Sequence, residues 1–323
     1  MSERSLPAGT IAAVGLGLGL GAWAAALAPV AVYVSSLAIF GLSHLAYEFR
    51  YCDKRFGLRY GRRFLLGVAV IGLSIAAIRA LRVAGVAAFG SAGTIEGALL
   101  IAACAWPLVL GGKARAVAAV FSLLFVLGWI ADAMAAMIVF ASIHNLTPIA
   151  FLGERFTGKR RAVAVATAAA AALVPAWLVY ELAPLQASGT AFAAWFGAPG
   201  RHLGSFVPHA LIGAPDAWRL FAAAAYLQVF HYAMTIVVLP ALGRVDDAEG
   251  GLLRWPSPRR FGGAVLLGSA GALGAFLLSF DDARSLYGIV AAVHAFIEPP
   301  LLLGTPALDR PRFGAAIGRF GIT

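Results

Sequence analysis

The chain has little charge for its length. Of its 323 residues, 12% are Asp, Glu, Lys or Arg and 61% are hydrophobic, and its mean hydropathy is +0.85. A soluble domain cannot bury this much apolar surface, so the composition predicts an all-α polytopic membrane protein. Because no charge-rich linker longer than roughly twenty residues divides the chain, we expect residues 1–323 to form a single integral membrane domain.

Cysteine is nearly absent, and several common motifs are missing. The two cysteines, Cys52 and Cys104, make neither a disulfide framework nor a CxxC metal site. The sequence contains no GxxxxGK[ST] and no HExxH, and we interpret the glycines of GLGLGLGAW (residues 15–23) as small residues for helix packing. These absences exclude thiol redox chemistry, P-loop nucleotide binding and the usual zinc-protease motif.

Long apolar runs fill most of the chain. A spanning helix needs about twenty mainly apolar residues, and this length predicts about ten helices, with the run 115–153 divided into two at a turn near Asp132. The expected spans are 9–30, 31–50, 63–80, 93–111, 115–131, 133–153, 162–183, 217–242, 262–280 and 285–304. The remaining long stretch, 184–216, contains several Gly and Pro residues and predicts an interfacial segment or cap, in which we expect His202 and His209 to have a surface or interfacial role.

Basic residues are concentrated in every second loop. With ten helices and a cytoplasmic N-terminus, the cytoplasmic segments contain all of the 25 Lys and Arg except Arg79, Arg82, Arg201, Arg219 and Arg284. This agrees with the positive-inside rule. We therefore expect a multi-pass protein of a bacterial-type inner membrane with both termini in the cytoplasm, and we attribute the net charge of +10 to these loops facing the lipid bilayer and not to nucleic acid.

Four histidines lie within apolar segments, where ionisable groups are rare and usually functional. They are His44, His144, His231 and His294. Two of them are followed four residues later by an acid, Glu48 and Glu298, which places each pair on one helix face. In the expected topology all four helices run toward the cytoplasm, and the histidines fall in a layer about 8 Å thick.

Imidazole and carboxylate together favour iron or manganese over metals that prefer thiolates. We predict that the four histidines are the metal ligands and catalytic residues, and that Glu48 and Glu298 bind the metal directly or orient the imidazoles. Non-haem iron is the expected cofactor. Four nearby residues are candidate hydrogen-bonding partners of the ligands: Gln228, Tyr47, Asn145 and Tyr232.

Other interpretations of the same residues remain open. Any single His or Glu can simply hydrogen-bond a neighbouring helix. Two histidine pairs on four helices also suit haem b in an electron-transfer subunit, and another divalent metal is a further alternative. A transporter or proton channel is the third interpretation, although a proton path should string ionisable groups across the whole membrane. Asp132, and Asp281 and Asp282, are expected in turns, where Asp or Ser would cap the next helix.

The segment Gly41–Glu48, GLSHLAYE, resembles the Brp/Blh family of membrane carotene-cleaving dioxygenases, in which an early helix carries a His followed four residues later by an acid. His44 and Glu48 match this motif, whereas Ser43 and Leu45 replace the family's Pro and Gly, and Glu replaces its Asp. The other histidines match in kind only, and a later HxxxH of the family appears here as Gln228-x-x-His231. The resemblance implies non-haem iron, molecular oxygen and a carotenoid substrate.

Together these observations predict an integral membrane non-haem iron oxygenase or oxidoreductase. Its substrate would be lipophilic, carotenoid-like or lipid-like, and would enter an apolar pocket beside the metal. Iron would activate oxygen at an open coordination position. The sequence leaves the substrate, the number of metal ions and any electron-donor partner open.

Overall fold

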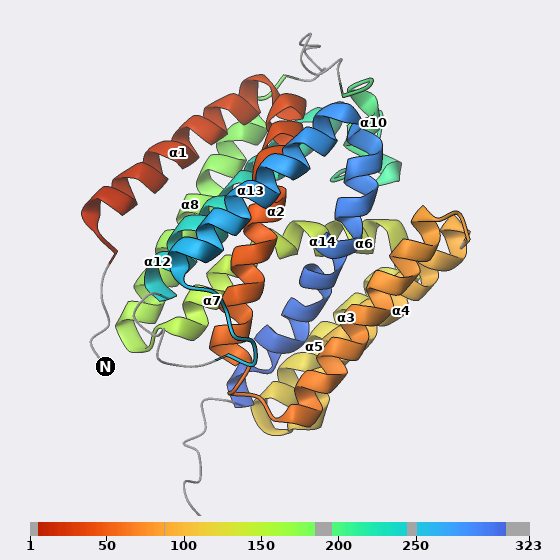
Figure 1. Ribbon diagram of the computed structural model, residues 1–323. Coiled ribbons are helices and arrows are strands. Elements are labelled where there is room, and N and C mark those ends of the chain that lie inside the picture. Colours follow the sequence, from red (N-terminus) through yellow and green to blue (C-terminus); the bar gives the residue numbers. More distant parts are fainter. Residues whose placement is uncertain (1–5, 87, 185–195, 244–250, 308–323) are drawn as a thin grey trace, which may run out of the picture.

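Helices make up nearly all of the chain in the computed structural model (Figure 1). The structure describes residues 6–86, 88–184, 196–243 and 251–307, and within these ranges it contains no strand. Nine of the described helical segments are long and apolar enough to cross a membrane, and a bent pair of shorter helices raises the number to ten. The all-α, multi-pass architecture expected from composition is therefore confirmed.

The spanning segments follow the expected order closely. They are α1 (Ala8–Leu27), α2 (Pro29–Phe56), α3 (Arg62–Val83), α4 (Phe89–Ala105) with the 3₁₀ turn Trp106–Leu110, α5 (Gly112–Ala131), α6 (Ala133–His144) with α7 (Thr147–Arg155), α8 (Gly158–Leu182), α11 (Ala217–Ala233) with α12 (Leu239–Gly243), α13 (Pro258–Leu278) and α14 (Phe280–Leu303). The apolar run 115–153 is indeed two helical segments. Its second half is α6 and α7, which are bent by 45° at their junction.

Short turns join the helices into an antiparallel bundle. Asp132 ends α5 and caps α6 by accepting a hydrogen bond from the backbone N–H of Ala135 at 2.9 Å, and Ser279 caps α14 in the same way, through the N–H of Asp282. At the opposite end, Gly111 adopts φ +72° between the 3₁₀ turn and α5, a conformation that suits glycine. The turn expected at Asp132 is confirmed. The loop expected at residues 281–282 is wrong, because α14 begins at Phe280 and places Asp281 and Asp282 in its first turn, although a Ser caps the helix as expected.

The two ends of the bundle differ in charge. We call the end that carries the α2–α3, α7–α8 and α12–α13 connections the basic end, because Lys and Arg are concentrated there. The other end is called the capped end, because residues 196–216, including α10 (Gly200–Leu203), cover it (Figure 1). At the basic end, Glu154 of α7 receives hydrogen bonds from Arg55 of α2 and from Arg59 of the α2–α3 connection, which attaches α7 to the end of α2.

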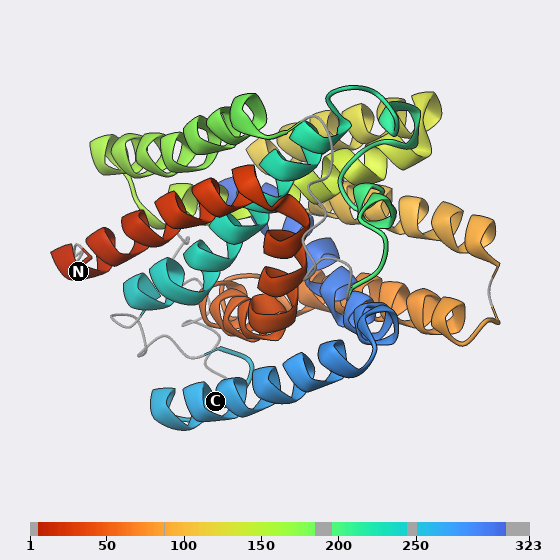
Figure 2. The same cartoon turned by 90° about the horizontal axis from the view of Figure 1, so that it is seen from above.

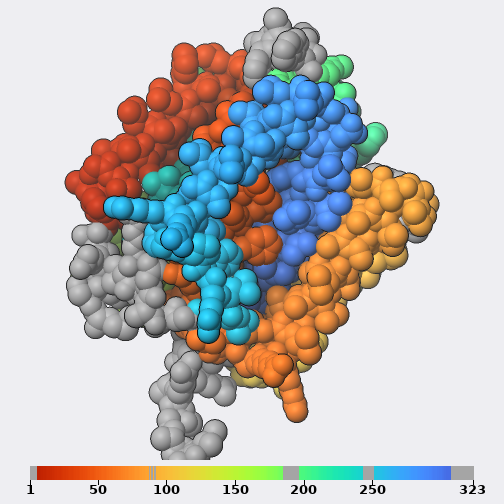
Figure 3. Space-filling model, in the orientation of Figure 1, coloured from red at the N-terminus to blue at the C-terminus, as the bar shows by residue number. Residues whose placement is uncertain are grey.

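Helices α2, α11 and α14 form the interior of the bundle. Seen from above, α2 and α14 lie inside, with α8 and α13 at opposite edges (Figure 2). Small residues allow close packing of α8 on α11, where the Tyr226 hydroxyl donates to the carbonyl of Ala171 at 2.5 Å. On the face drawn in Figure 3, α14 is visible between α13 and α3.

The described part of the predicted interfacial segment packs onto the helix ends. Leu203 and Val207 are buried against Tyr33 of α2 and Phe221 of α11. His209 is exposed, as expected. The same expectation for His202 is wrong: its ring is fully buried, bonds the Phe196 carbonyl at 3.1 Å and contacts the Phe280 ring. Burial lowers the pKa of His202. Residues 185–195 of the predicted segment lie outside the described residues.

Candidate metal centre

The structure brings the four intramembrane histidines together from four helices. His44 lies on α2, His144 on α6, His231 on α11 and His294 on α14. The ring centroids of neighbouring pairs are separated by 5.3 Å (His44 and His231), 4.7 Å (His231 and His144), 4.6 Å (His144 and His294) and 5.0 Å (His294 and His44). The four imidazoles therefore form a closed ring at one level of the bundle.

Two of these helices depart from regular α-geometry after their histidines, and a third contains two prolines directly after Glu298. Helix α6 ends at His144, whose carbonyl accepts from the Thr147 hydroxyl at 2.7 Å. Helix α11 leads into a π-turn, Met234–Val238, and the Thr235 hydroxyl donates to the His231 carbonyl at 2.9 Å. In α14, two prolines follow Glu298. Such interruptions of the helical hydrogen-bond ladder are common at functional sites.

Both predicted glutamates reach the ring. Oε2 of Glu298 lies 2.7 Å from Nδ1 of His144, so a glutamate from α14 contacts a histidine from α6. Oε2 of Glu48 lies 3.2 Å from Nε2 of His231, which links α2 to α11. Each glutamate therefore contacts a histidine of another helix and not the histidine one turn before it.

Apart from the contact between Glu48 and His231, many polar atoms of this cluster lack a well-formed hydrogen bond in the described part of the chain. They are both carboxylate oxygens of Glu48, Oε1 of Glu298, and both ring nitrogens of His231 and His294. Three of these residues, Glu48, His231 and Glu298, are only 1–2% exposed. Buried polar atoms are nearly always paired, because each unpaired one costs about 1–3 kcal/mol. Several unpaired lone pairs directed at one place are what a metal ion would satisfy.

Two overlapping groups of ligand atoms have the spacing for a metal ion. One is His44, His231 and His294, and the other is His144, His294 and Glu298, with the atoms of each group within 4.8 Å of one another. Imidazole nitrogen binds metals at about 2.0–2.1 Å, so three ligands around one ion lie roughly 3.3–3.6 Å from one another. The atoms of either group would have to approach one another by up to about 1.3 Å to close around an ion. Their donor types, imidazole and carboxylate, fit the group predicted for the site.

The predicted hydrogen-bonding neighbours divide into two pairs. Tyr232 stacks on His44, with ring centroids 4.3 Å apart and an angle of 28° between the planes, and Asn145 is buried directly after His144. These two lie at the ring. The other two do not contact it in the way expected.

Gln228 donates to the Tyr33 carbonyl at 3.3 Å and to the Ser36 hydroxyl at 2.8 Å, both on α2, and its role as a partner of His231 stays a prediction. Tyr47 packs edge-on against Phe261 of α13. The reason is angular. At 100° per residue, Tyr47 projects about 100° away from Glu48, which faces the ring.

A cavity of about 990 Å³ leads to the histidines from the capped end. It lies between α6 on one side and α2, α11 and α14 on the other, with Arg79 and Arg82 of α3 and Ser205 of the cap near its mouth. All four histidines line it. The His144 side chain is 12% exposed, whereas His231 is only 1% exposed. His144 is therefore the ring member most accessible from the cavity.

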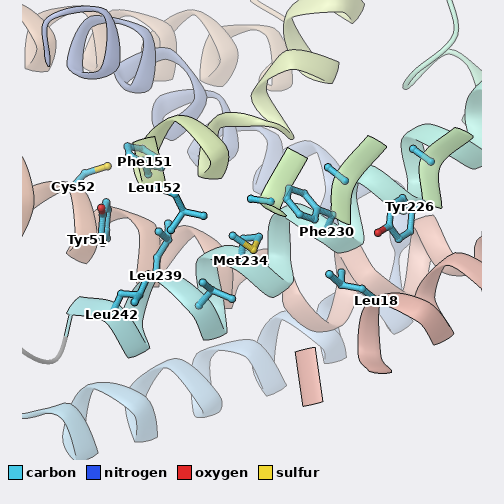
Figure 4. Close-up of a cluster of buried hydrophobic side chains, with 14 of the residues drawn as sticks. Leu18, Tyr51, Cys52, Phe151, Leu152, Tyr226, Phe230, Met234, Leu239 and Leu242 are labelled. Atoms are coloured by element: carbon cyan, nitrogen blue, oxygen red, sulfur yellow. The ribbon is translucent and has the colours of Figure 1, made fainter. Parts of the chain in front are cut away.

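The other side of the ring is filled by apolar side chains. Toward the basic end, α2, α7 and the segment after the π-turn contribute the cluster drawn in Figure 4. Its labelled members on this side are Tyr51, Cys52, Phe151, Leu152, Met234, Leu239 and Leu242. Phe151 and Leu239 are fully buried. The cavity consequently ends at the histidines and does not continue to the basic end.

A further buried carboxylate, besides Glu48 and Glu298, was not identified from the sequence. Glu96 of α4 is 3% exposed and forms ion pairs with Arg79 at 2.6 Å and with Arg82 at 3.3 Å. The expected third helix ended at residue 80, which left Arg82 in a loop, but α3 continues to Val83 and presents both arginines to α4. The sequence did contain a signal for this ion pair. It was a single acid within an apolar run, preceded by two basic residues near the end of the helix before it.

Comparisons with models of protein families, with curated proteins and with solved structures found no match to this chain. The resemblance of residues 41–48 to the Brp/Blh family is thus neither supported nor contradicted and stays a prediction. The function must be argued from the site itself.

Proposed function

We propose that this protein is an integral membrane metal-dependent oxidoreductase, and specifically a non-haem iron oxygenase that acts on a lipophilic substrate. The observation that carries the proposal is the ring of four histidines and two glutamates with unpaired buried lone pairs. Mixed imidazole and carboxylate ligands suit iron. A lipophilic molecule, carotenoid-like or lipid-like, is the proposed substrate class, with molecular oxygen as the second reactant.

The residues of the chain would hold and orient the metal. Glu298 accepts a hydrogen bond from Nδ1 of His144 when that nitrogen is protonated, which fixes the imidazole tautomer and leaves Nε2 as a ligand atom. Glu48 is placed to do the same for His231 or to bind directly. When bound, iron supplies an open coordination position at which oxygen can be activated. The apolar cluster on the basic side excludes water from that position.

The geometry favours this function over the two alternatives. A haem with two histidine ligands lies between those histidines. In this ring the other two histidines occupy that space, because the centroids of neighbouring rings are only 4.6–5.3 Å apart. A transporter or channel requires a path through the membrane, whereas this cavity ends at the histidines. A cavity that opens at one end only and ends at candidate metal ligands is typical of an enzyme.

The charge distribution supports one orientation in the membrane. Lys and Arg are concentrated in the basic-end loops, so we propose that this end and both termini are cytoplasmic, in an inner membrane of bacterial type. The cavity would then open toward the opposite face. Substrate would reach the metal from that side of the bilayer, and an electron donor, if the reaction needs one, is a further partner to identify.

Metal analysis of the purified protein tests the proposal. Wild-type protein should contain at least one equivalent of iron, and His144→Ala should lose most of it, because second-shell changes alone weaken metal binding about 10–100-fold. His209→Ala is the matched control, since His209 is exposed on the cap. Less than about half an equivalent of iron, manganese or zinc in wild-type protein, unchanged in His144→Ala, would contradict the proposal.

A further inference from the structure

The cavity changes character along its length. On α14 its lining runs from Asp281 to Phe296, a distance of about 22 Å at 1.5 Å per residue. Its mouth at the capped end is lined by Arg79, Arg82, Arg284, Asp281, Asp282 and Ser205. Its deeper part toward the histidines has an apolar wall on α6 and α14, with Met137, Ile138, Phe140, Ala292 and Phe296, and polar groups of Gln228 and Tyr232 on α11. A molecule that fills it would meet charge at one end and hydrocarbon at the other.

Most of the charged groups at the mouth have a partner within the protein. Arg79 and Arg82 share one carboxylate, Glu96, at 2.6 and 3.3 Å, and this group keeps a net positive charge. Asp281 is bonded by the Arg201 guanidinium of the cap. Asp282 accepts from the Ser279 hydroxyl at 2.7 Å and keeps its negative charge. With Arg284 included, four arginines face three carboxylates, and the mouth has a net positive charge.

Arg284 is different. Its guanidinium donates to the Ser205 hydroxyl at 2.8 Å and lies 5.8 Å from the centroid of the Tyr33 ring. In the described part of the chain no carboxylate lies within ion-pair distance of it. A partly buried guanidinium that has a neutral hydroxyl as its hydrogen-bond partner retains its full charge and most of its five donors. It lies about 15 Å along α14 from His294.

We infer that the cavity binds an amphiphile whose anionic head group pairs with Arg284 at the capped end and whose hydrocarbon chain extends toward His144 and His294. The inference rests on the proposed oxygenase function for the reaction, which would take place on the chain about 15 Å from the head group. A fatty-acid carboxylate and the phosphate of an anionic phospholipid have the required chemistry in common. A hydrocarbon without polar groups would leave Arg284 unpaired.

Binding is measured separately from metal content. Full-length protein is treated with a chelator and placed in nanodiscs of phosphatidylcholine, with a fluorescent fatty acid as the reporter ligand. Displacement of this reporter is then measured on titration with oleate, with oleyl alcohol and with dioleoyl-phosphatidylglycerol. Wild-type protein should bind oleate or the phosphatidylglycerol at least about tenfold more tightly than the alcohol, as expected for charge-assisted hydrogen bonds. The anion that binds more tightly identifies the source of the head group.

Variants of Arg284 assign the preference to this residue. Arg284→Gln should lose the preference for the anion, and Arg284→Lys should keep a measurable part of it because the charge remains. Arg219→Gln is the control, since Arg219 lies in the first turn of α11 and pairs with Asp216 at 3.5 Å. Equal affinity of wild-type protein for oleate, phosphatidylglycerol and oleyl alcohol would overturn the inference, as would a full preference in Arg284→Gln.

The position of the chain gives a second test. Oleate with a photoreactive diazirine at its methyl end should label peptides that contain Phe140 or Phe296, which lie beside the histidines. Labelling confined to the lipid-facing surface would overturn the inference. Iron present without anion preference would contradict this inference and leave the metal centre intact, whereas anion preference without iron would contradict only the proposed function.

Discussion

The Glu96 ion pairs allow a quantitative prediction about the support of the cavity mouth. In Glu96→Gln the side chain keeps its shape but loses the charge that faces Arg79 and Arg82. Removing one partner of a buried pair costs about 3–5 kcal/mol. The two arginine side chains are 21% and 29% exposed, and solvent therefore reduces the loss. We expect a decrease of about 2 kcal/mol in the free energy of unfolding.

Thermal unfolding in a mild non-ionic detergent, followed by tryptophan fluorescence, measures this decrease. For a chain of this size, about 2 kcal/mol corresponds to a decrease in Tm of roughly 4 °C. Glu181→Gln is the control, because Glu181 is an exposed acid near the last residue of α8, toward the capped end. A Tm of Glu96→Gln within about 1 °C of both wild type and the control would refute the claim that this pair stabilises the fold.

Two further predictions concern packing and loop attachment. Gly97→Ala should destabilise the protein by about 1–2 kcal/mol, because a Cβ at this position would lie 2.0 Å from the Trp129 ring. Gly93→Ala on the same helix is the control: a Cβ there would have nothing within 4 Å, so this variant should be neutral or slightly stabilising. Calorimetry measures both changes. Asp53→Ala should speed trypsin cleavage after Arg254 several-fold. The Asp53 carboxylate accepts a hydrogen bond from the Leu252 N–H at 2.9 Å and so attaches the segment before α13 to α2. An unchanged cleavage rate would mean that other contacts fix that segment.

The helices could be predicted from sequence because their signals are local. Length, apolarity and the alternation of basic loops gave spans close to those observed, including the division near Asp132. The common level of the histidines was also accessible, since it depends only on residue counts and helix direction. The structure brings those histidines within contact of one another, as the depth calculation required.

The pairings across helices could not be predicted, because they depend on helix rotation and contact. Glu298 contacts His144 and not His294, and Gln228 turns to α2, although sequence spacing associates each with its own helix neighbour. The π-turn after His231 also has no clear sequence signal. The pairing of Glu96 likewise depended on α3 extending one turn further than expected.

The central claim, that the histidine ring holds a metal, is tested most directly by X-ray anomalous scattering. Data collected on either side of the iron absorption edge should give one peak, or two, inside the ring of His44, His144, His231 and His294. Ligand nitrogens should lie about 2.0–2.2 Å from it, with Glu48 or Glu298 bound to the ion or to an imidazole. An iron peak elsewhere, or no peak in crystals in which the four imidazoles are well defined, would contradict the account and favour simple helix-to-helix hydrogen bonds.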